Sequence, residues 1–356
     1  MRFHPSEEQL AIQDVLKGTL ADAMPAERLR AICDGDADFD PASWDALMAL
    51  GLGGLALPEA MGGLGLGLVD LAMAIEVLGQ GAAVGPVIEH VLAGLALSRA
   101  ADAALREKWL PGIASGSTVA TIALGGQWLP ATWDVAVADG KASGSVRFVA
   151  GVRAAGVFVV GTTGGGLALI EAGEGVTGVP VRSSDRTRRL SSVTFDGAPA
   201  TMLFAAGNPE VGRIFDAGLV LLAADALGGA QYCVDLSVAY SKDRQQFGQP
   251  IGRFQALKHQ LATMALEVEP SRPLVWYAAY AHDAGLADSP RAAAMAKAHL
   301  ADRFVSVARA AVAAHGGIGY TWEYALNTWF RRSLFDRAYL GSPSVHRARA
   351  ADLGDW

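Results

Sequence analysis

The order of apolar and polar positions divides the chain into three stretches. From residue 6 to about residue 115, apolar side chains recur at three- and four-residue steps, the spacing of a buried helical face. From 116 to about 205, short apolar or alternating runs are separated by Gly, Asp and Ser, which predicts strands joined by turns. Long Ala-, Leu- and Val-rich stretches return after 206. We expect a mainly α fold with a central β-domain, divided as 1–115, 116–205 and 206–356.

The first stretch carries clear helix ends. Ser6, followed by two glutamates and Gln9, is typical of a helix start, because its hydroxyl can accept from a first-turn amide. Pro41 can open another helix, which Gly51 can end. The residues expected on the inner face of the first helix are Leu10, Ile12, Val15, Leu16 and Leu20.

The middle stretch predicts seven strands. The three glycines at 164–166 lack the Lys-Ser/Thr of a phosphate-binding loop and no helix follows them, so we expect a hairpin turn there. The expected strands are Thr118–Leu124, Asp134–Ala138, Val146–Val149, Val157–Thr162, Leu167–Glu171, Thr177–Val181 and Ser192–Phe195.

A Gly/Pro turn between two helices stands out in the last stretch. A long apolar helix is expected over about 214–242, and Pro250 stops it from continuing. A second amphipathic helix follows, with Phe254, Leu257, Leu261, Met264 and Val268 on one face. Arg244 lies at the bend between the helices. A guanidinium held there can bind a phosphate or carboxylate with two hydrogen bonds.

Composition excludes several classes of protein. The 356 residues carry a formal net charge of -7, which provides no basic surface for nucleic acid. Hydrophobic residues make up 51% and charged residues 18%, so we expect extensive burial, part of it at subunit contacts. Cys33 and Cys233 have no metal-ligand spacing and are expected to be reduced core thiols. The polar N-terminus and the absence of an uninterrupted apolar run of ~20 residues predict a cytoplasmic chain without a membrane span.

Three sequence blocks together resemble the acyl-CoA dehydrogenase family. The first is Arg-Gln-Gln-Phe-Gly-Gln-Pro-Ile-Gly-Arg-Phe-Gln-Ala-Leu-Lys-His at 244–259. The second is His-Gly-Gly-Ile-Gly-Tyr-Thr-Trp-Glu-Tyr at 315–324, and the third is Leu-Gly-Leu-Gly-Gly-Leu-Ala-Leu-Pro-Glu at 50–59 with Gly-Gly-Leu-Gly at 62–65. The resemblance implies an N-terminal helical domain, a middle β-barrel-like domain and a C-terminal four-helix bundle.

The resemblance also implies a reaction, but the residue that performs it is missing. In this family a Glu removes a proton from Cα of an acyl-CoA while hydride passes to FAD, and electron-transfer flavoprotein is the usual acceptor. Leu340 occupies one position where the family places this Glu, and Gly218 occupies the other. Asp216 and Asp225 are the acids nearest to Gly218, and Asp216 is a weak candidate for the base.

The FAD-binding positions are only half retained. Family members hold the ADP part with a neighbouring subunit's C-terminal helices, and the corresponding residues here are Arg244, Phe247, Gln255, His315, Gly316 and Gly317. Ala313 replaces a family Gln in this half. In the β-domain, residues 123–128 and Phe148-Val149-Ala150 lack the hydroxyls and acid that the family places around the flavin ring.

This pattern resembles the smaller, Glu-lacking subunit of a heteromeric (α2β2-type) bacterial acyl-CoA dehydrogenase. A homologous partner chain would then carry the Glu, and some such pairs act on CoA thioesters of bulky steroid side chains. Two alternatives remain open: a homo-oligomeric dehydrogenase with a relocated acidic base, and a non-catalytic scaffold of the same fold. A flavin monooxygenase of this fold also lacks the Glu, but it would need a better flavin cradle.

Overall fold

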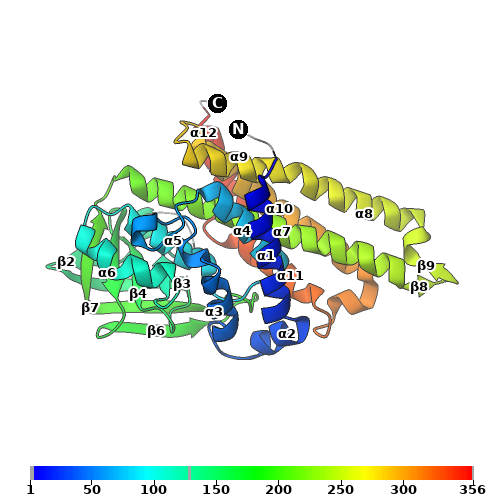
Figure 1. Cartoon of the computed structure of the whole chain (residues 1–356), viewed down its shortest axis with the longest axis horizontal. Coiled ribbons are helices and arrows are strands. Elements are labelled where there is room, and N and C mark those ends of the chain that lie inside the picture. Colours follow the sequence, from blue (N-terminus) through cyan, green and yellow to red (C-terminus); the bar gives the residue numbers. More distant parts are fainter. Residues whose placement is uncertain (1–3, 127–129, 355–356) are drawn as a thin grey trace.

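The computed structural model describes residues 4–126 and 130–354 and confirms a mainly helical chain with a central sheet (Figure 1). The sheet lies at one end of the molecule, and the long C-terminal helices extend from beside it to the opposite end. The N-terminal helices lie between and across them. These helices are α1 (Glu7–Ala23), α2 (Ala26–Asp34), α3 (Pro41–Ala49), α4 (Leu68–Gln80), α5 (Val87–Ser98) and α6 (Ala103–Ala114).

The predicted start of α1 is confirmed, but its predicted inner face is partly wrong. The Ser6 hydroxyl accepts from the Gln9 amide at 3.2 Å, and the Gln9 side chain accepts from the Ser6 amide. Leu16 and Leu20 are buried and Ile12 packs against the core, a stripe spaced by four residues. Leu10 and Val15 are 47% and 53% exposed, because both lie outside that stripe on the helix surface.

The sheet is mainly antiparallel and has the order β1-β4-β5-β7-β3-β2, with β6 paired to β7. The predicted hairpin is confirmed, since Thr162 pairs with Gly166 across the turn. Two strands are longer than predicted, because their alternation continues through polar residues that face solvent. The strands are β1 (Ala120–Ala123), β2 (Ala136–Ala138), β3 (Lys141–Ala150), β4 (Val157–Thr162), β5 (Gly166–Glu171), β6 (Val176–Val181) and β7 (Leu190–Phe204).

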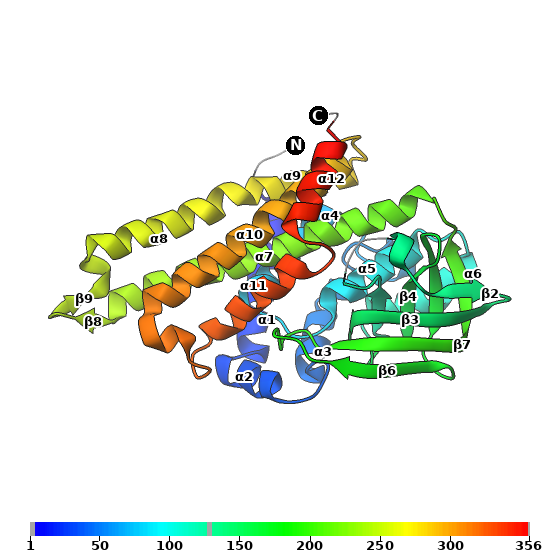
Figure 2. The ribbon, with the colours of Figure 1, turned by 180° about the vertical axis from the view of Figure 1, so that it is seen from behind.

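A bundle of helices completes the fold, and α7 runs through its centre (Figures 1 and 2). This helix is long and apolar enough to cross a membrane, but 89% of its most apolar window is buried inside the protein, as in a core helix. The helices are α7 (Pro209–Asp243), α8 (Gln255–Val268), α9 (Arg272–Asp283), α10 (Ser289–His315), α11 (Leu326–Ala338) and α12 (Pro343–Asp352). Between α7 and α8, the small hairpin of β8 (Gln245–Gln246) and β9 (Gln249–Pro250) forms a tip far from the main sheet.

Candidate functional site

The two positions at which the resemblance implies a base meet in space, although 122 residues separate Gly218 from Leu340 in the sequence. Gly218 lies on α7, and Leu340 follows α11 with a φ of 56°. A Cβ atom built on Gly218 would lie 3.2 Å from a methyl carbon of Leu92 and 3.3 Å from one of Leu340. All three residues are buried. The three residues that meet here, from α5, α7 and the α11–α12 turn, are therefore apolar, and none of their side chains can accept a proton.

The weak candidate Asp216 does not point to this spot. Two residues on a helix are separated by about 200° around its axis, so Asp216 and Gly218 face in nearly opposite directions. Arg349 of α12 holds the Asp216 carboxylate at 2.7 Å. Burial raises the pKa of Asp216, and the Arg349 guanidinium opposes that shift. The structure thus makes Asp216 part of a buried ion pair.

The other nearby acid, Asp225, is part of a buried charge cluster. Its carboxylate lies 2.8 Å from Arg188 and 2.5 Å from Arg332, and all three side chains are buried. Burial opposes ionisation of Asp225, but the two guanidinium groups outweigh it and hold its pKa far below the usual range. Arg188 also pairs with Asp336 at 2.7 Å. The cluster joins the segment before β7 to α7 and α11.

Glu89 is a buried acid that the sequence analysis missed. It lies in the first turn of α5, three residues before Leu92, and is 1% exposed. Neither carboxylate oxygen makes a hydrogen bond of ordinary geometry. Burial raises the pKa of Glu89, although Arg188 opposes the shift. Burial also raises the pKa of Tyr339, and the nearby Glu89 charge adds to that effect. The sequence signal that could have identified Glu89 is that it is the one Glu in the apolar stretch Val87–Ser98.

Three of the expected cofactor residues lie at the tip between α7 and α8. Arg244 caps the end of α7, and Gln255 is the exposed first residue of α8. Phe247 is 90% exposed, has a φ of 54° and meets the edge of Phe254 with ring centroids 6.0 Å apart. An aromatic ring held out in this way has most of its surface available to another molecule.

The other three expected cofactor residues, His315, Gly316 and Gly317, lie at the end of α10. His315 is buried, and its ring stacks on Tyr240 of α7 with centroids 4.4 Å apart. Its Nδ1 lies 2.8 Å from the Ala311 carbonyl, while Nε2 has no partner. Burial lowers the pKa of His315, which favours the neutral ring. A Cβ atom built on Gly316 or Gly317 would meet nothing within 4 Å, so there is open space beside this backbone.

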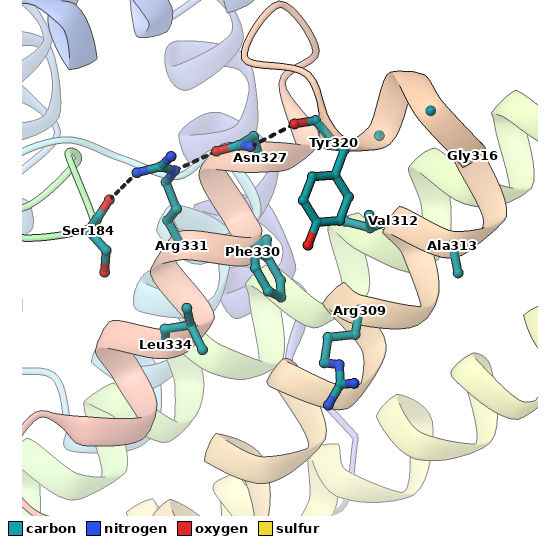
Figure 3. Close-up of a pocket in the computed structure, with 12 residues that line it drawn as sticks. Ser184, Arg309, Val312, Ala313, Gly316, Tyr320, Asn327, Phe330, Arg331 and Leu334 are labelled. Atoms are coloured by element: carbon teal, nitrogen blue, oxygen red, sulfur yellow. Dashed lines mark hydrogen bonds between the residues drawn. The ribbon is translucent and has the colours of Figure 1, made fainter.

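That open space belongs to a pocket of about 810 Å³ (Figure 3). Arg331 of α11 is fixed in it by Asn327 at 2.5 Å and by the Ser184 carbonyl at 3.3 Å. Arg309 and Ala313 line it from α10. The volume suits a cofactor-sized ligand. The lining residues are Ser184, Arg309, Val312, Ala313, Gly316, Gly317, Gly319, Tyr320, Asn327, Phe330, Arg331 and Leu334.

The β-domain contains a smaller hollow, of about 340 Å³, at the expected flavin cradle. Phe148 lines it with a φ of 63°, and the buried Trp133 indole donates to the Leu124 carbonyl at 3.1 Å. The hydroxyls of Thr132 and Ser145 also line it, but residues 148–150 provide none. Residues 127 and 128 of the expected loop lie outside the described residues.

The two halves therefore differ in their fit to FAD. The α7–α8 tip and the α10 end provide an exposed aromatic ring, arginines and open backbone, which suit the ADP part. The hollow in the sheet has Thr132, Ser145 and Arg147 in its lining, but residues 148–150 carry no hydroxyl where the family places one beside the flavin ring. Among the described residues, no group of three or more His, Cys, Asp or Glu could hold a metal ion.

The chain is similar to known proteins over nearly its whole length. Family models described as "Acyl-CoA dehydrogenase, N-terminal domain" and "Acyl-CoA dehydrogenase, C-terminal domain" match residues 6–117 and 208–353. The chain is 30% identical to "Acyl-CoA dehydrogenase IpdE2" of Mycolicibacterium smegmatis, over 95% of this chain and 96% of that protein. The structure titled "Tcur3481-Tcur3483 steroid ACAD G363A variant" has a TM-score of 0.91 and 30% identity, over 98% of each chain. Butyryl-CoA dehydrogenase from Megasphaera elsdenii shares the fold, with a TM-score of 0.87 over 100% of each chain and 24% identity.

Proposed function

The chain belongs to the acyl-CoA dehydrogenase family, and we propose that it is the subunit of a heteromeric, FAD-dependent enzyme that lacks the catalytic carboxylate. A homologous partner chain then provides the Glu that removes the Cα proton. This chain contributes its C-terminal helices to the FAD sites of the assembly. We propose the domain division 1–115, 116–205 and 206–356. The last of these domains would contribute residues to the cofactor site.

The apolar meeting point of Leu340, Gly218 and Leu92 carries the proposal. General-base catalysis needs a carboxylate within hydrogen-bond reach of the proton that it removes. A leucine cannot accept a proton, and a side chain at 218 would require the Leu92 and Leu340 methyl groups to shift, because its Cβ would already lie 3.2–3.3 Å from them. Arg349 pairs with Asp216, and Arg188 and Arg332 pair with Asp225, so the carboxylates of both acids already have charged partners.

FAD is the cofactor of this family, and its bound isoalloxazine accepts the hydride from the substrate. In this chain, Arg244 would bind a phosphate of the ADP part and Phe247 would pack against its adenosine. Gln255 and His315 would complete this half of the site, and the open space at Gly316 and Gly317 would allow the ligand to approach the backbone. The partner's β-domain would hold the flavin ring, since residues 148–150 of this chain lack the hydroxyl that the family places there.

The name given to a similar structure supports a proposal for the substrate class. That name, "Tcur3481-Tcur3483 steroid ACAD G363A variant", contains the word steroid and joins two protein names. We extend this to the present chain: the assembly dehydrogenates a bulky, steroid-type acyl-CoA at its α,β bond. Electron-transfer flavoprotein would receive the electrons.

Co-expression with homologous, Glu-bearing chains tests the proposal. We expect a stable complex that purifies yellow, with flavin absorbance and dehydrogenase activity, while this chain alone binds little flavin. Purification of this chain alone as a yellow, active dehydrogenase would contradict the proposal.

Glu89 favours a second candidate, a homo-oligomeric dehydrogenase with a relocated acid. Its carboxylate is buried without a hydrogen bond of ordinary geometry, and it lies one helical turn from Leu92 at the apolar meeting point. In that case the chain alone would be active, and a Glu89→Gln variant would lose this activity while it kept its flavin. Inactivity of the chain alone, with or without added FAD, would exclude this candidate.

A further inference from the structure

The pocket at the end of α10 is positively charged in an acidic protein. The chain has a formal net charge of -7, yet the residues that line this pocket include two arginines and no acid. Two guanidinium groups without a nearby carboxylate create a local field that attracts anions. The rings of Tyr320 and Phe330 in the same lining offer flat apolar surface. A ligand with a phosphate group and an aromatic base fits this combination.

The two arginines are not equivalent. Arg331 is already bound to Asn327 and Ser184, and its guanidinium lies 5.0 Å from the centre of the Trp322 ring. Within residues 4–126 and 130–354, the Arg309 guanidinium makes neither a hydrogen bond nor an ion pair. Figure 3 shows it extending from α10 on the side of Phe330 away from Arg331. Its five donors are therefore available to a ligand.

Arg309 also lies near Ala313, the position at which the ADP-binding half of the expected FAD site departs from the family. Ala313 replaces the family Gln, and it follows Arg309 by four residues on α10. Residues four apart on a helix lie on one face, one turn from each other, and both of these line the pocket. The missing amide donor and the unpaired guanidinium thus share the same helical face.

We infer that Arg309 replaces the missing glutamine and binds the pyrophosphate of FAD in this pocket. The inference rests on the proposed function, because it assumes that this chain completes an FAD site. Arg309 is a cofactor-binding residue in this account and takes no part in proton transfer. Coenzyme A also contains an adenosine diphosphate group, so the test must separate the two sources.

The test uses the complex with the Glu-bearing partner, with flavin removed and FAD titrated back while flavin fluorescence is recorded. A charged hydrogen bond contributes ~1.5–3 kcal/mol, so Arg309→Ala should weaken FAD binding roughly 10- to 100-fold. Adding Ala313→Gln to that variant should restore most of the affinity, because it returns the family's amide donor. Arg303→Ala is the matched control, since Arg303 lies on the same helix and pairs with Glu267 outside the pocket. It should bind FAD like the unmodified complex.

Three outcomes would overturn the inference, each in a distinct way. If Arg309→Ala binds FAD with unchanged affinity in a complex that contains flavin, Arg309 has no such role and the proposed function stands. If the variant instead loses affinity for 3′,5′-ADP, a probe for the coenzyme A nucleotide, the pocket serves the substrate. If the unmodified complex binds no FAD, the proposed function and this inference both fail.

Discussion

Replacing Asp225 by Asn should destabilise the protein strongly without removing a catalytic group. The carboxylate is completely buried between Arg188 and Arg332, at 2.8 Å and 2.5 Å. Asn keeps the shape of the side chain but removes its charge, which leaves two buried guanidinium groups facing a neutral amide. Breaking a buried ion pair in this way costs about 3–5 kcal/mol. That is a large part of the ~5–15 kcal/mol by which folded proteins are typically stable.

The assay is urea unfolding of the complex, followed by circular dichroism, with dehydrogenase turnover measured on the same samples. Asp235→Asn is the matched control, because Asp235 lies on the same helix but is exposed. This control should change the free energy of unfolding by less than about 0.5 kcal/mol. For Asp225→Asn we expect a much lower urea midpoint and nearly normal turnover per folded complex.

The pH dependence provides a second readout of the same pair. The pKa of Asp225 is lowered in the folded state, so its stabilising contribution is complete above the unfolded pKa of about 3.9 and is lost as pH falls below it. The unmodified protein should therefore lose more stability below about pH 4 than Asp225→Asn does. Loss of turnover in Asp225→Asn at unchanged stability would refute this reasoning and make Asp225 the candidate base.

Three further changes test other parts of the account. Phe247→Ala should change the free energy of unfolding by less than about 0.5 kcal/mol, because the ring is exposed. It should lower the flavin content of the complex, measured by absorbance. Unchanged flavin content would contradict the proposed role of Phe247. Asp216→Asn should keep the turnover of the complex, since this acid pairs with Arg349 on the side of α7 away from Gly218. Lost turnover in a folded Asp216→Asn variant would contradict this prediction. Burial lowers the pKa of His90 and of His346 to about 4, so stability should fall as pH drops from about 6.5 to 4, where only the unfolded state takes up these protons. Urea midpoints that do not change between pH 7 and pH 5 would refute the last prediction.

Local patterns in the sequence were enough to predict most of the fold. The spacing of apolar residues located the helices, and short runs between glycines located the strands, because both signals depend on neighbours within a few residues. The ends of β7 were missed, since its second half alternates through polar residues. Leu10 was placed wrongly because several helical faces in α1 carry an apolar residue.

The candidate site was predictable only in part, because its contacts join distant segments. The sequence marks Leu340 and Gly218 by resemblance, but nothing local shows that Leu340 and Leu92 of α5 both lie beside Gly218. Glu89 was missed since a single acid in an apolar helix does not reveal what it faces. Arg309 was missed for the opposite reason, because an exposed arginine on a helix ordinarily faces solvent.

The most direct test of the central claim removes the partner's Glu from the assembled complex and replaces it with Gln. The complex is mixed with its acyl-CoA without oxygen, and the loss of flavin absorbance is followed in a stopped-flow instrument. We predict that the flavin stays oxidised, because Leu340, Gly218 and Leu92 provide no proton acceptor. Reduction of the flavin at a normal rate would show that this chain contributes a base, and would contradict the account.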